Sequence, residues 1–310
     1  MINTINSKNK ALVSIVYATY NRKTDILSAL EDLKKQTYNN FEIIVVDNGS
    51  KDGTSEAIKT NFPTAKIIGL KENLGCPAGR NIGIREANGE FIMTLDDDAI
   101  SEPTLIERGA TILRNNPDIG IVSGKILTHG TNQIESWDKK WSTEFIDNSF
   151  FTYIFQEGCS LIRKKVFDEV GVYPENFFIQ FENRDLGNRV IDAGYKILYY
   201  PPMIIYHKGN PKSTSEFFYA YRNSLYLYIK QYPYLRLFKY ASALTGLYIY
   251  KFLKVNKIHL LPKAWYEVIK ESKQLFKQRK VLKKSTIKEI DRLRKCVNNL
   301  NQYYSKIAFK

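Results

Sequence analysis

The first 125 residues alternate between short apolar runs and segments with helical periodicity, and this alternation is the strongest constraint on the fold. The apolar runs predict strands, because each is only a few residues long and is bounded by turn residues. They lie at Leu12–Tyr17, Phe41–Val46, Lys66–Leu70, Phe91–Leu95 and Ile119–Ser123. Strands that alternate with helices in this way predict an α/β fold, with a mostly parallel sheet flanked by helices.

Three consecutive carboxylates, Asp96, Asp97 and Asp98, directly follow the strand expected at Phe91–Leu95. In open sheets of this kind, ligands bind beyond the carboxyl ends of the strands, and Asp47 stands at another such end. Neighbouring anions raise one another's pKa values, so a hard divalent cation with oxygen ligands is the natural partner here. The alternative is that these residues only cap the helix that follows.

The second part of the chain predicts fewer strands. A strand is expected at Ser160–Ile162 and a helix at Glu182–Ala193. A last strand, Tyr195–Tyr200, is expected to stop at Pro201-Pro202, because proline cannot donate to a sheet. From about Ser213 onward, aromatic and basic helical patterns replace the strands, and we therefore place a domain boundary near residue 210.

The formal charge of +14 is concentrated at the C-terminal end. Residues 251–310 hold 17 Lys and Arg against 4 Asp and Glu, whereas the rest of the chain is nearly neutral. Such a region suits an anionic membrane surface, a polyanion or an acidic partner. Nucleic acid is not expected, because no recognised binding motif accompanies the charge.

The location expected from the sequence is cytoplasmic. Cys76, Cys159 and Cys296 are far apart, show no metal-ligand spacing and do not suggest a disulfide framework, which fits a reducing compartment. The N-terminal residues lack a signal-peptide core, and no apolar stretch is long enough to span a bilayer. We expect a soluble protein or one that is peripheral on the inner face of the cell membrane.

Five motifs then occur in a fixed order. They are Val16-Tyr17-Ala18-Thr19-Tyr20-Asn21-Arg22; Val45-Val46-Asp47-Asn48-Gly49-Ser50-Lys51-Asp52-Gly53-Thr54; Asn73-Leu74-Gly75 with Gly79-Arg80-Asn81-Ile82-Gly83; Leu95-Asp96-Asp97-Asp98; and Phe177-Phe178 leading to Glu182, Asp185 and Arg189. In these motifs the chain resembles inverting family 2 glycosyltransferases with the GT-A fold, of the bacterial rhamnosyltransferase-like type. The resemblance covers roughly residues 10–210.

The resemblance implies a domain organisation and a reaction. Residues 1–210 would form the GT-A nucleotide-diphospho-sugar transferase domain, with a nucleotide-sugar half at about 10–125 and an acceptor half at about 126–210. Residues 211–310 would form a helical, aromatic and basic region. The enzyme would move a sugar, a hexose such as rhamnose, from a nucleotide-diphospho-sugar donor to a glycan or lipid-linked acceptor, by direct displacement with inversion, in polysaccharide biosynthesis.

The resemblance also implies the donor-binding residues. They are Thr19, Tyr20, Arg22, Asp47, Asn73, Arg80, Asp96 and Asp97. Asp47 would recognise the nucleobase; alternatively, it forms an Asx turn in a Gly- and Ser-rich loop. Arg80 would contact the donor by a charge-assisted hydrogen bond, and the alternative for it is a surface salt bridge.

In the family, the Asp-x-Asp (DXD) motif binds the donor and a Mn²⁺ or Mg²⁺ ion. We carry the metal role to Asp96 and Asp98, with His207 completing the set of ligands, since imidazole nitrogen beside carboxylate oxygen is a plausible donor set. The alternative for His207 is a partly exposed loop histidine.

An inverting transferase needs a general base to deprotonate the acceptor hydroxyl. Relatives often supply it from the second position of an acidic pair, which is Asn183 in this chain. An amide cannot accept that proton, so Glu182, or with slightly less preference Asp185, must serve. The alternative for both carboxylates is stabilisation of a helix N-terminus. Gly158 is a further expected contact, to the acceptor.

Two other functions remain open at this point. The substitution at Asn183 allows a catalytically decayed glycan-binding or scaffold protein. A sugar-nucleotidyltransferase shares the sheet type, but its Gly-rich, basic first loop is missing at Ala18–Arg22. In the C-terminal region, Leu235–Leu261 is apolar but interrupted by lysines. It would lie in a membrane interface, or pack as a helical bundle on the catalytic domain or on a second subunit of a homo-oligomer.

Overall fold

The computed structural model describes residues 10–131, 133–134, 146–209 and 214–309. Within these ranges a nine-stranded sheet has the order β3-β2-β1-β4-β8-β6-β9-β5, with β7 paired to β9. The strands are β1 Val13–Thr19, β2 Phe41–Asp47, β3 Lys66–Gly69, β4 Phe91–Leu95, β5 Ala99–Ser101, β6 Ile119–Thr128, β7 Phe150–Thr152, β8 Cys159–Arg163 and β9 Lys196–His207. The expected domain boundary near residue 210 falls just outside the described residues.

The N-terminal half of the sheet is parallel. β1 pairs in parallel with β2 and with β4, and β2 pairs in parallel with β3. β1, β4 and the second half of β2 are buried on both faces, which explains why they appear in the sequence as continuous apolar runs, whereas β3 at the edge of the sheet is exposed or half-buried. Thr19 and Asp47 are register partners at the ends of β1 and β2, and the acidic triplet follows β4 at the same edge. The predicted α/β class with a helix-flanked sheet is therefore confirmed.

The other half of the sheet contains antiparallel pairs, beginning with β4 and β8. Its strand β9 is longer than the sequence predicts. It does not stop at Pro201-Pro202 but continues to His207. Its register with β6 shifts between Tyr199, opposite Ser123, and Ile204, opposite Lys125. The two prolines lie in this irregular stretch, where the regular hydrogen bonds between the strands are interrupted and the N–H groups that proline lacks are not needed. The continuation pairs His207 with Ala99 of β5 and so brings the imidazole beside the acidic triplet.

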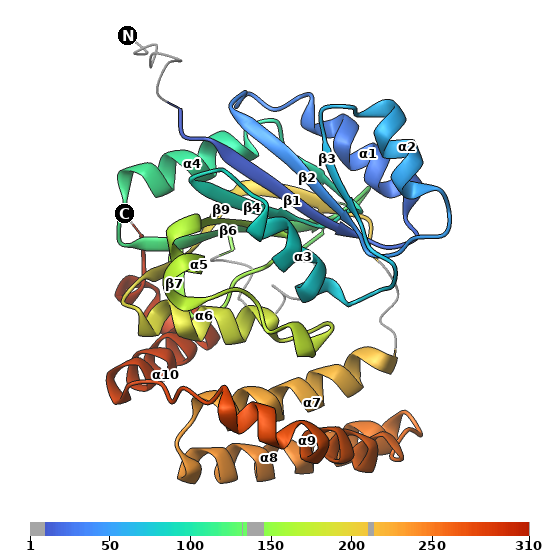
Figure 1. The fold of residues 1–310 in the computed structure, drawn as a ribbon. Coiled ribbons are helices and arrows are strands. Elements are labelled where there is room, and N and C mark those ends of the chain that lie inside the picture. The colour runs from blue at the N-terminus through green and yellow to red at the C-terminus, as the bar shows by residue number, and fades with distance from the viewer. Residues whose placement is uncertain (1–9, 132, 135–145, 210–213, 310) are drawn as a thin grey trace.

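Helices cover both faces of the sheet (Figure 1). They are α1 Lys23–Leu33, α2 Thr54–Asn61, α3 Cys76–Arg85, α4 Leu105–Asn115, α5 Lys164–Val170 and α6 Glu182–Asp192, with a 3-10 turn at Glu175–Phe177. α1, α2 and α4 share one buried apolar cluster with the sheet. α3, α5 and α6 share another with it, on the opposite face. The sheet is thus the middle layer, and the edge that carries the acidic triplet is left for a ligand.

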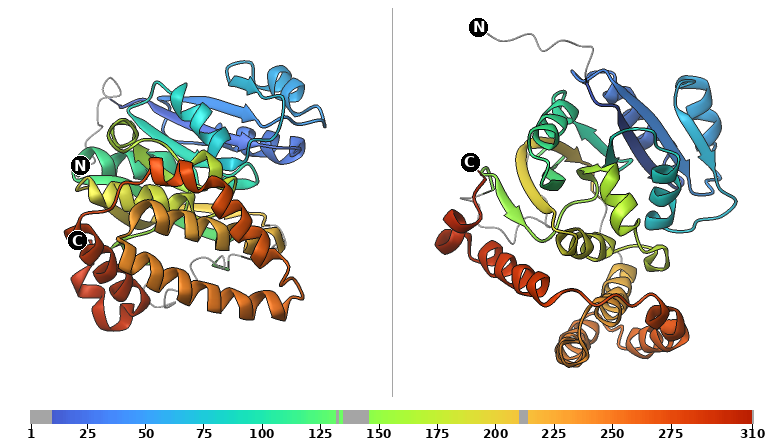
Figure 2. Two further views of the ribbon diagram at one scale, coloured as in Figure 1. Left: turned by 60° about the horizontal axis from the view of Figure 1, so that its bottom comes forward. Right: turned by 60° about the vertical axis from the view of Figure 1, so that its left-hand side comes forward.

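The C-terminal helices pack below this three-layer unit. They are α7 Thr214–Gln231, α8 Tyr234–Lys254, α9 Leu260–Lys277, α10 Lys284–Asn298 and α11 Leu300–Tyr303, followed by a 3-10 turn at Tyr304–Lys306. α7 lies between the sheet domain and the pair α8 and α9 (Figures 1 and 2). Buried side chains of α7, α8 and α9 form one cluster around Tyr221, Phe252 and Leu275, while α10 packs beside β7. No helix in the described part of the chain combines the length and apolarity needed to cross a membrane.

Candidate active site

Asp96, the first residue of the triplet, points toward α3. Its Oδ1 accepts a hydrogen bond from Arg80 Nη2 at 2.7 Å. Arg80 is buried, and its Nη1 lies 3.5 Å from Glu157 Oε2. A Cβ atom added to Gly158 would lie 1.9 Å from Asp96 Oδ2, so this glycine leaves the space that the carboxylate occupies. Arg80 therefore does not form the surface salt bridge considered as its alternative; it is a buried cation between two acidic groups.

Asp97 and Asp98 turn toward β1 and β9. Thr19 Oγ1 donates to Asp97 Oδ2 at 2.6 Å. Arg22 Nη1 lies 3.5 Å from Asp97 Oδ1 and also donates to Asp98. His207 Nε2 lies 3.0 Å from Asp98 Oδ1. The ends of β1 and β9, which are far apart in the chain, thus meet at the triplet. The donor-binding roles of Thr19 and Arg22 and the metal role of His207 stay predictions.

The two inner carboxyl groups differ in acidity. Burial raises the pKa of Asp97 to about 7, although the hydrogen bond from Thr19 and the charge of Arg22 act against this rise. Burial acts in the same direction on Asp98, but hydrogen bonds and charges from His207 and Arg22 outweigh it and lower the pKa of Asp98 to about 2. Asp98 is therefore anionic over the physiological range, whereas Asp97 is only partly ionised near neutral pH.

The structure brings together two of the three residues expected to hold a divalent cation, His207 and Asp98. Two ligands at right angles on an octahedral ion of this size lie about 3.0 Å apart, because each bond is about 2.1 Å long. His207 Nε2 and Asp98 Oδ1 form a direct ion pair at 3.0 Å, a separation that two adjacent ligands could also have. Asp96 faces Arg80 instead, and within the described ranges no group of three or more His, Cys, Asp or Glu side chains converges as a metal site.

A cavity of about 180 Å³ opens beside Asp96. Its polar walls include Arg80, Asp96, Glu157, Gly158, Glu182, Asn183 and His207. Three polar atoms of these walls, Arg80 Nε, Glu157 Oε1 and Glu182 Oε2, are buried without a hydrogen-bond partner in the described structure. Buried polar atoms are costly to leave unpaired, so their presence in a cavity wall indicates a place for a polar ligand.

Glu157 and Glu182 form a hydrogen-bonded carboxyl pair in this wall. Burial, and next the charge of Glu182, hold the pKa of Glu157 far above its usual range. Burial also raises the pKa of Glu182, but the hydrogen bond from Glu157 and the charge of Arg80 favour its anionic form. Both carboxyl groups of this buried pair are therefore held above their ordinary pKa, and a proton shared between them relieves the repulsion of two buried anions. Sequence reasoning missed Glu157, and the only signal for it was its position directly before Gly158.

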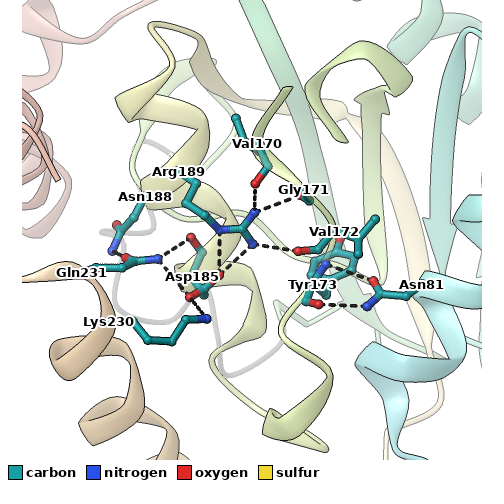
Figure 3. Close-up of polar contacts among 10 residues, drawn as sticks. All are labelled: Asn81, Val170, Gly171, Val172, Tyr173, Asp185, Asn188, Arg189, Lys230 and Gln231. Atoms are coloured by element: carbon teal, nitrogen blue, oxygen red, sulfur yellow. Dashed lines mark hydrogen bonds and ion pairs between the residues drawn. The ribbon is translucent and has the colours of Figure 1, made fainter. Parts of the chain in front are cut away.

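Asp185, the second candidate base, lies elsewhere. It is fully buried on α6, where it binds Arg189 Nε at 2.8 Å, Gln231 Nε2 at 2.9 Å and Lys230 Nζ at 3.0 Å (Figure 3). Burial would raise the pKa of Asp185, but the charges of Arg189 and Lys230 outweigh it, and the net pKa is lowered. These contacts tie α6 to α7. Asp185 lines a separate cavity and not that of Glu182, and its role as the alternative base stays a prediction.

The loop that precedes Glu182 is held in an unusual conformation by α7. Phe178, Gln180 and Phe181 all have positive φ angles, of 63°, 73° and 72°. The buried Asn223 Nδ2 of α7 lies 3.0 Å from the carbonyl oxygen of Phe177, 2.8 Å from that of Ile179 and 2.7 Å from that of Gln180.

Arg222, next to Asn223 on α7, also holds this loop. Its Nη2 donates to the carbonyl oxygens of Asn176 at 3.1 Å and Phe177 at 3.0 Å. Asn183, at the position where relatives often have the base, donates from Nδ2 to the carbonyl of Phe155 at 2.8 Å. The helical region thus fixes the backbone from which Glu182 enters the cavity.

Asp47 is the last residue of β2, the strand that pairs with β1 at the same edge of the sheet. Its Oδ1 accepts from the backbone N–H of Ser50 at 2.8 Å, and its Oδ2 accepts from Ser55 Oγ at 2.5 Å. These are the local contacts expected of an Asx-type loop, and nucleobase recognition by Asp47 stays a prediction. Asn48, which the sequence did not single out, joins this loop to the next one by bonding the carbonyl of Gly75 and the N–H of Leu74, both at 3.0 Å.

Tyr20 and Asn73 border this end of the site. Tyr20 is 44% exposed, so its ring is available to a ligand. Asn73 Oδ1 accepts from the N–H of Gly75 at 2.9 Å and shapes the turn into α3. Neither residue lines the cavity of Glu182, and their donor-binding roles stay predictions.

Comparison with known proteins places the chain among sugar-transferring enzymes. The family model "Glycosyl transferase family 2" matches residues 14–171. The chain is 27% identical over 207 residues to glycosyltransferase AglE of Haloferax volcanii, covering 64% of this chain and 67% of that relative. It is 33% identical over 174 residues to an uncharacterized glycosyltransferase of Rickettsia typhi, covering 53% of this chain and 54% of that protein. The chain therefore spans only about half the length of this second relative.

Solved structures share the fold at low sequence identity. Mannosyltransferase PcManGT from Pyrobaculum calidifontis, in complex with GDP-Man and Mn²⁺, superposes with a TM-score of 0.57 at 17% identity, over 85% of this chain and 76% of that one. TarS 1-349 of S. aureus, in complex with UDP, gives 0.55 at 18% identity, over 70% of this chain and 65% of that one. At these identities the likeness concerns the fold.

Proposed function

Because the chain belongs to glycosyl transferase family 2, we propose that it transfers a sugar from a nucleotide-diphospho-sugar donor to a hydroxyl group of a glycan or lipid-linked acceptor, with inversion at the anomeric carbon. The observation that carries the proposal is the carboxyl pair Glu157–Glu182, which lies in one cavity wall with Asp96 and Arg80 and has unpaired oxygen atoms. Complexes of the structural neighbours with UDP and with GDP-Man and Mn²⁺ support a donor of this class. A hexosyl donor remains our expectation, with rhamnose as the more specific prediction.

Glu182 acts as the general base in this proposal. The acceptor oxygen attacks the anomeric carbon while its proton passes to Glu182 Oε2. The bond between the anomeric carbon and the diphosphate oxygen breaks, and its electron pair leaves with the nucleoside diphosphate. The hydrogen bond between the Glu157 and Glu182 carboxyl groups keeps Glu182 oriented. Asp185 supports α6 through its ion pairs.

Asp98 and His207 would hold a Mn²⁺ or Mg²⁺ ion, with Asp96 as the further ligand that the sequence predicts. The bound ion would neutralise the charge that develops on the leaving diphosphate. Thr19, Tyr20, Arg22, Asp47, Asn73, Arg80 and Asp97 are proposed to bind the donor, and Gly158 to border the acceptor.

Location and partners follow from the same proposal. Cys76, Cys159 and Cys296 are unbridged, which supports a reducing, cytoplasmic setting. An acceptor linked to a lipid would lie at the inner face of the cell membrane, where the basic C-terminal region meets an anionic surface. A homo-oligomer formed through the helical region is the alternative use of that surface.

A screen of nucleotide sugars tests this function. We expect release of a nucleoside diphosphate from one donor with Mn²⁺, and its loss when a chelator is added. A glycan-binding or scaffold protein, the second candidate, is favoured by Asn183. It would bind nucleotide sugars or glycans without any turnover. In that outcome Asn183→Asp is the discriminating variant, since a decayed transferase would regain turnover if the missing carboxylate were its only defect.

A further inference from the structure

The most exposed large apolar side chains of the described chain all lie on two helices. Leu235, Phe238, Tyr250 and Leu253 of α8 and Tyr266 and Ile269 of α9 are each at least 60% exposed, a level that no other large apolar side chain reaches within the described residues. We call these six side chains the hairpin face. Single exposed apolar residues are ordinary, but a group on two adjacent helices marks a surface that meets another phase or molecule.

The position of the hairpin face is favourable for docking. α8 and α9 lie on the side of α7 that is remote from the sheet (Figures 1 and 2). Their inward side chains, among them Phe252 and Leu275, are buried against α7, so the helices are already folded and their outer side is uncovered. A partner that covers the hairpin face therefore needs no rearrangement of the sheet domain.

The charge around the hairpin face is strongly positive. Residues 234–277 contain nine lysines and arginines against two glutamates. One of these glutamates, Glu267, is already neutralised by Arg222 of α7. On α9, Lys270, Lys273 and Lys277 are exposed beside the apolar side chains. Their long apolar stems let lysines extend from an apolar face toward phosphate groups while the ammonium stays hydrated.

We propose that the hairpin face docks on an anionic lipid bilayer. The apolar side chains enter the headgroup region, the tyrosines Tyr250 and Tyr266 lie at the interface, and the lysines contact lipid phosphates. This inference deepens the membrane contact named in the proposed function, but it does not depend on sugar transfer. Docking in this way would place α7 between the bilayer surface and the loop before Glu182, because Asn223 of α7 binds that loop directly.

A second copy of the chain is the competing occupant. Two copies that met through their hairpin faces would bring two strongly positive surfaces together, which like-charge repulsion disfavours. An anionic bilayer would instead attract the positive surface. The combination of apolar and basic side chains on one surface therefore favours lipid over self-association.

The experiment uses the full chain and vesicles of phosphatidylcholine alone or of phosphatidylcholine and phosphatidylglycerol in equal amounts. Removing residues 251–310 would also delete α9 and α10, whose buried side chains belong to the folded core, so point variants are required. Two serine pairs remove apolar contacts, Phe238→Ser with Leu253→Ser and Tyr266→Ser with Ile269→Ser. Phe238→Leu with Ile269→Leu is the matched apolar control.

Binding to anionic vesicles should fall roughly tenfold for each serine pair, and the leucine control should bind like the unmodified chain. Lys270→Gln, Lys273→Gln and Lys277→Gln together should weaken binding on the order of a hundredfold on anionic vesicles, at about fivefold per lysine. Lys34→Gln, Lys35→Gln and Lys59→Gln, which are exposed on the sheet domain, are the charge control.

Absence of vesicle binding, or unchanged binding by both serine pairs, overturns the inference. A dimer in sedimentation velocity that the serine pairs dissociate, without vesicle binding, assigns the hairpin face to a second copy and also overturns it. Donor turnover in buffer without vesicles is measured for each variant and should not change. Normal vesicle binding by a chain that turns over no donor would reject the proposed function and leave the docking inference intact.

Discussion

Asn223→Ala should uncouple the loop before Glu182 from α7. The loop contains three non-glycine residues with positive φ, Phe178, Gln180 and Phe181. Each of these backbone conformations costs roughly 1–2 kcal/mol, or on the order of 4 kcal/mol together. Asn223 Nδ2 lies within hydrogen-bond distance of three carbonyl oxygens of the loop. Its two N–H donors are shared among these acceptors, so at about 1 kcal/mol for each hydrogen bond this one side chain offsets about half of that cost.

The expected result has two parts. The free energy of unfolding, measured by urea denaturation, should fall by about 2–4 kcal/mol, because buried carbonyl groups lose their donor. The turnover rate with the donor found by the screen should fall roughly a hundredfold, because the carboxylate of Glu182 no longer sits where the acceptor needs it. KM for the donor should change little, since the triplet that binds it is on another segment.

The matched control is Thr245→Val, which removes the hydrogen bond of 2.8 Å between Thr245 and Tyr221 in the same helical bundle. It should lower stability without an effect on turnover. Hydrogen exchange of the amides in the loop should become faster only in Asn223→Ala. Normal turnover and unchanged loop exchange in a folded Asn223→Ala protein would refute the clamp.

Three further predictions concern acidic groups. Because burial raises the pKa of Glu182, and a general base must be deprotonated, turnover should begin to fall with decreasing pH before the ordinary glutamate pKa near 4.3 is reached. A pH profile of kcat checks this, and the fall should be absent in Glu182→Gln. The lowered pKa of Asp185 contributes stability that is complete above the unfolded-state value of about 3.9 and is lost as pH falls through the folded value. Asp185→Asn should therefore cost about 3–5 kcal/mol at neutral pH and progressively less in acid, as urea titrations at several pH values would show. Gly158→Ala should displace Asp96, whose Oδ2 would lie 1.9 Å from the new Cβ, and weaken donor affinity in calorimetry without loss of the folded state.

The parallel half of the sheet was predictable because its inner strands β1 and β4 and most of β2 are buried and appear as short apolar runs. β9 was cut short in the prediction because proline is usually excluded from sheets. Pro201 and Pro202 lie where the register between β6 and β9 shifts, and this shift cannot be predicted from the sequence of β9 alone. His207 was nevertheless placed beside the triplet, through the resemblance rather than through the expected strand.

The acidic residues of α6 show the limit of sequence reasoning most clearly. Glu182 and Asp185 are equally plausible bases at the start of one helix, three positions apart. Their partners differ, since Asp185 meets Arg189 and Lys230, whereas Glu182 meets a second carboxyl group, and on this difference we propose Glu182 as the base. Lys230 belongs to a segment that follows the family motifs, so no local pattern predicts that pairing.

The most direct test of the account is the turnover rate of Glu182→Gln with the donor found by the screen, with donor affinity measured in parallel. Glu175→Gln is the matched control, because Glu175 pairs with Arg85 on the outside of the same segment. We predict that Glu182→Gln binds the donor normally and loses turnover by about 10²–10⁴-fold, while the control keeps both properties. Turnover by Glu182→Gln within a few-fold of the unmodified chain would contradict the assignment of the base, and with it the central claim.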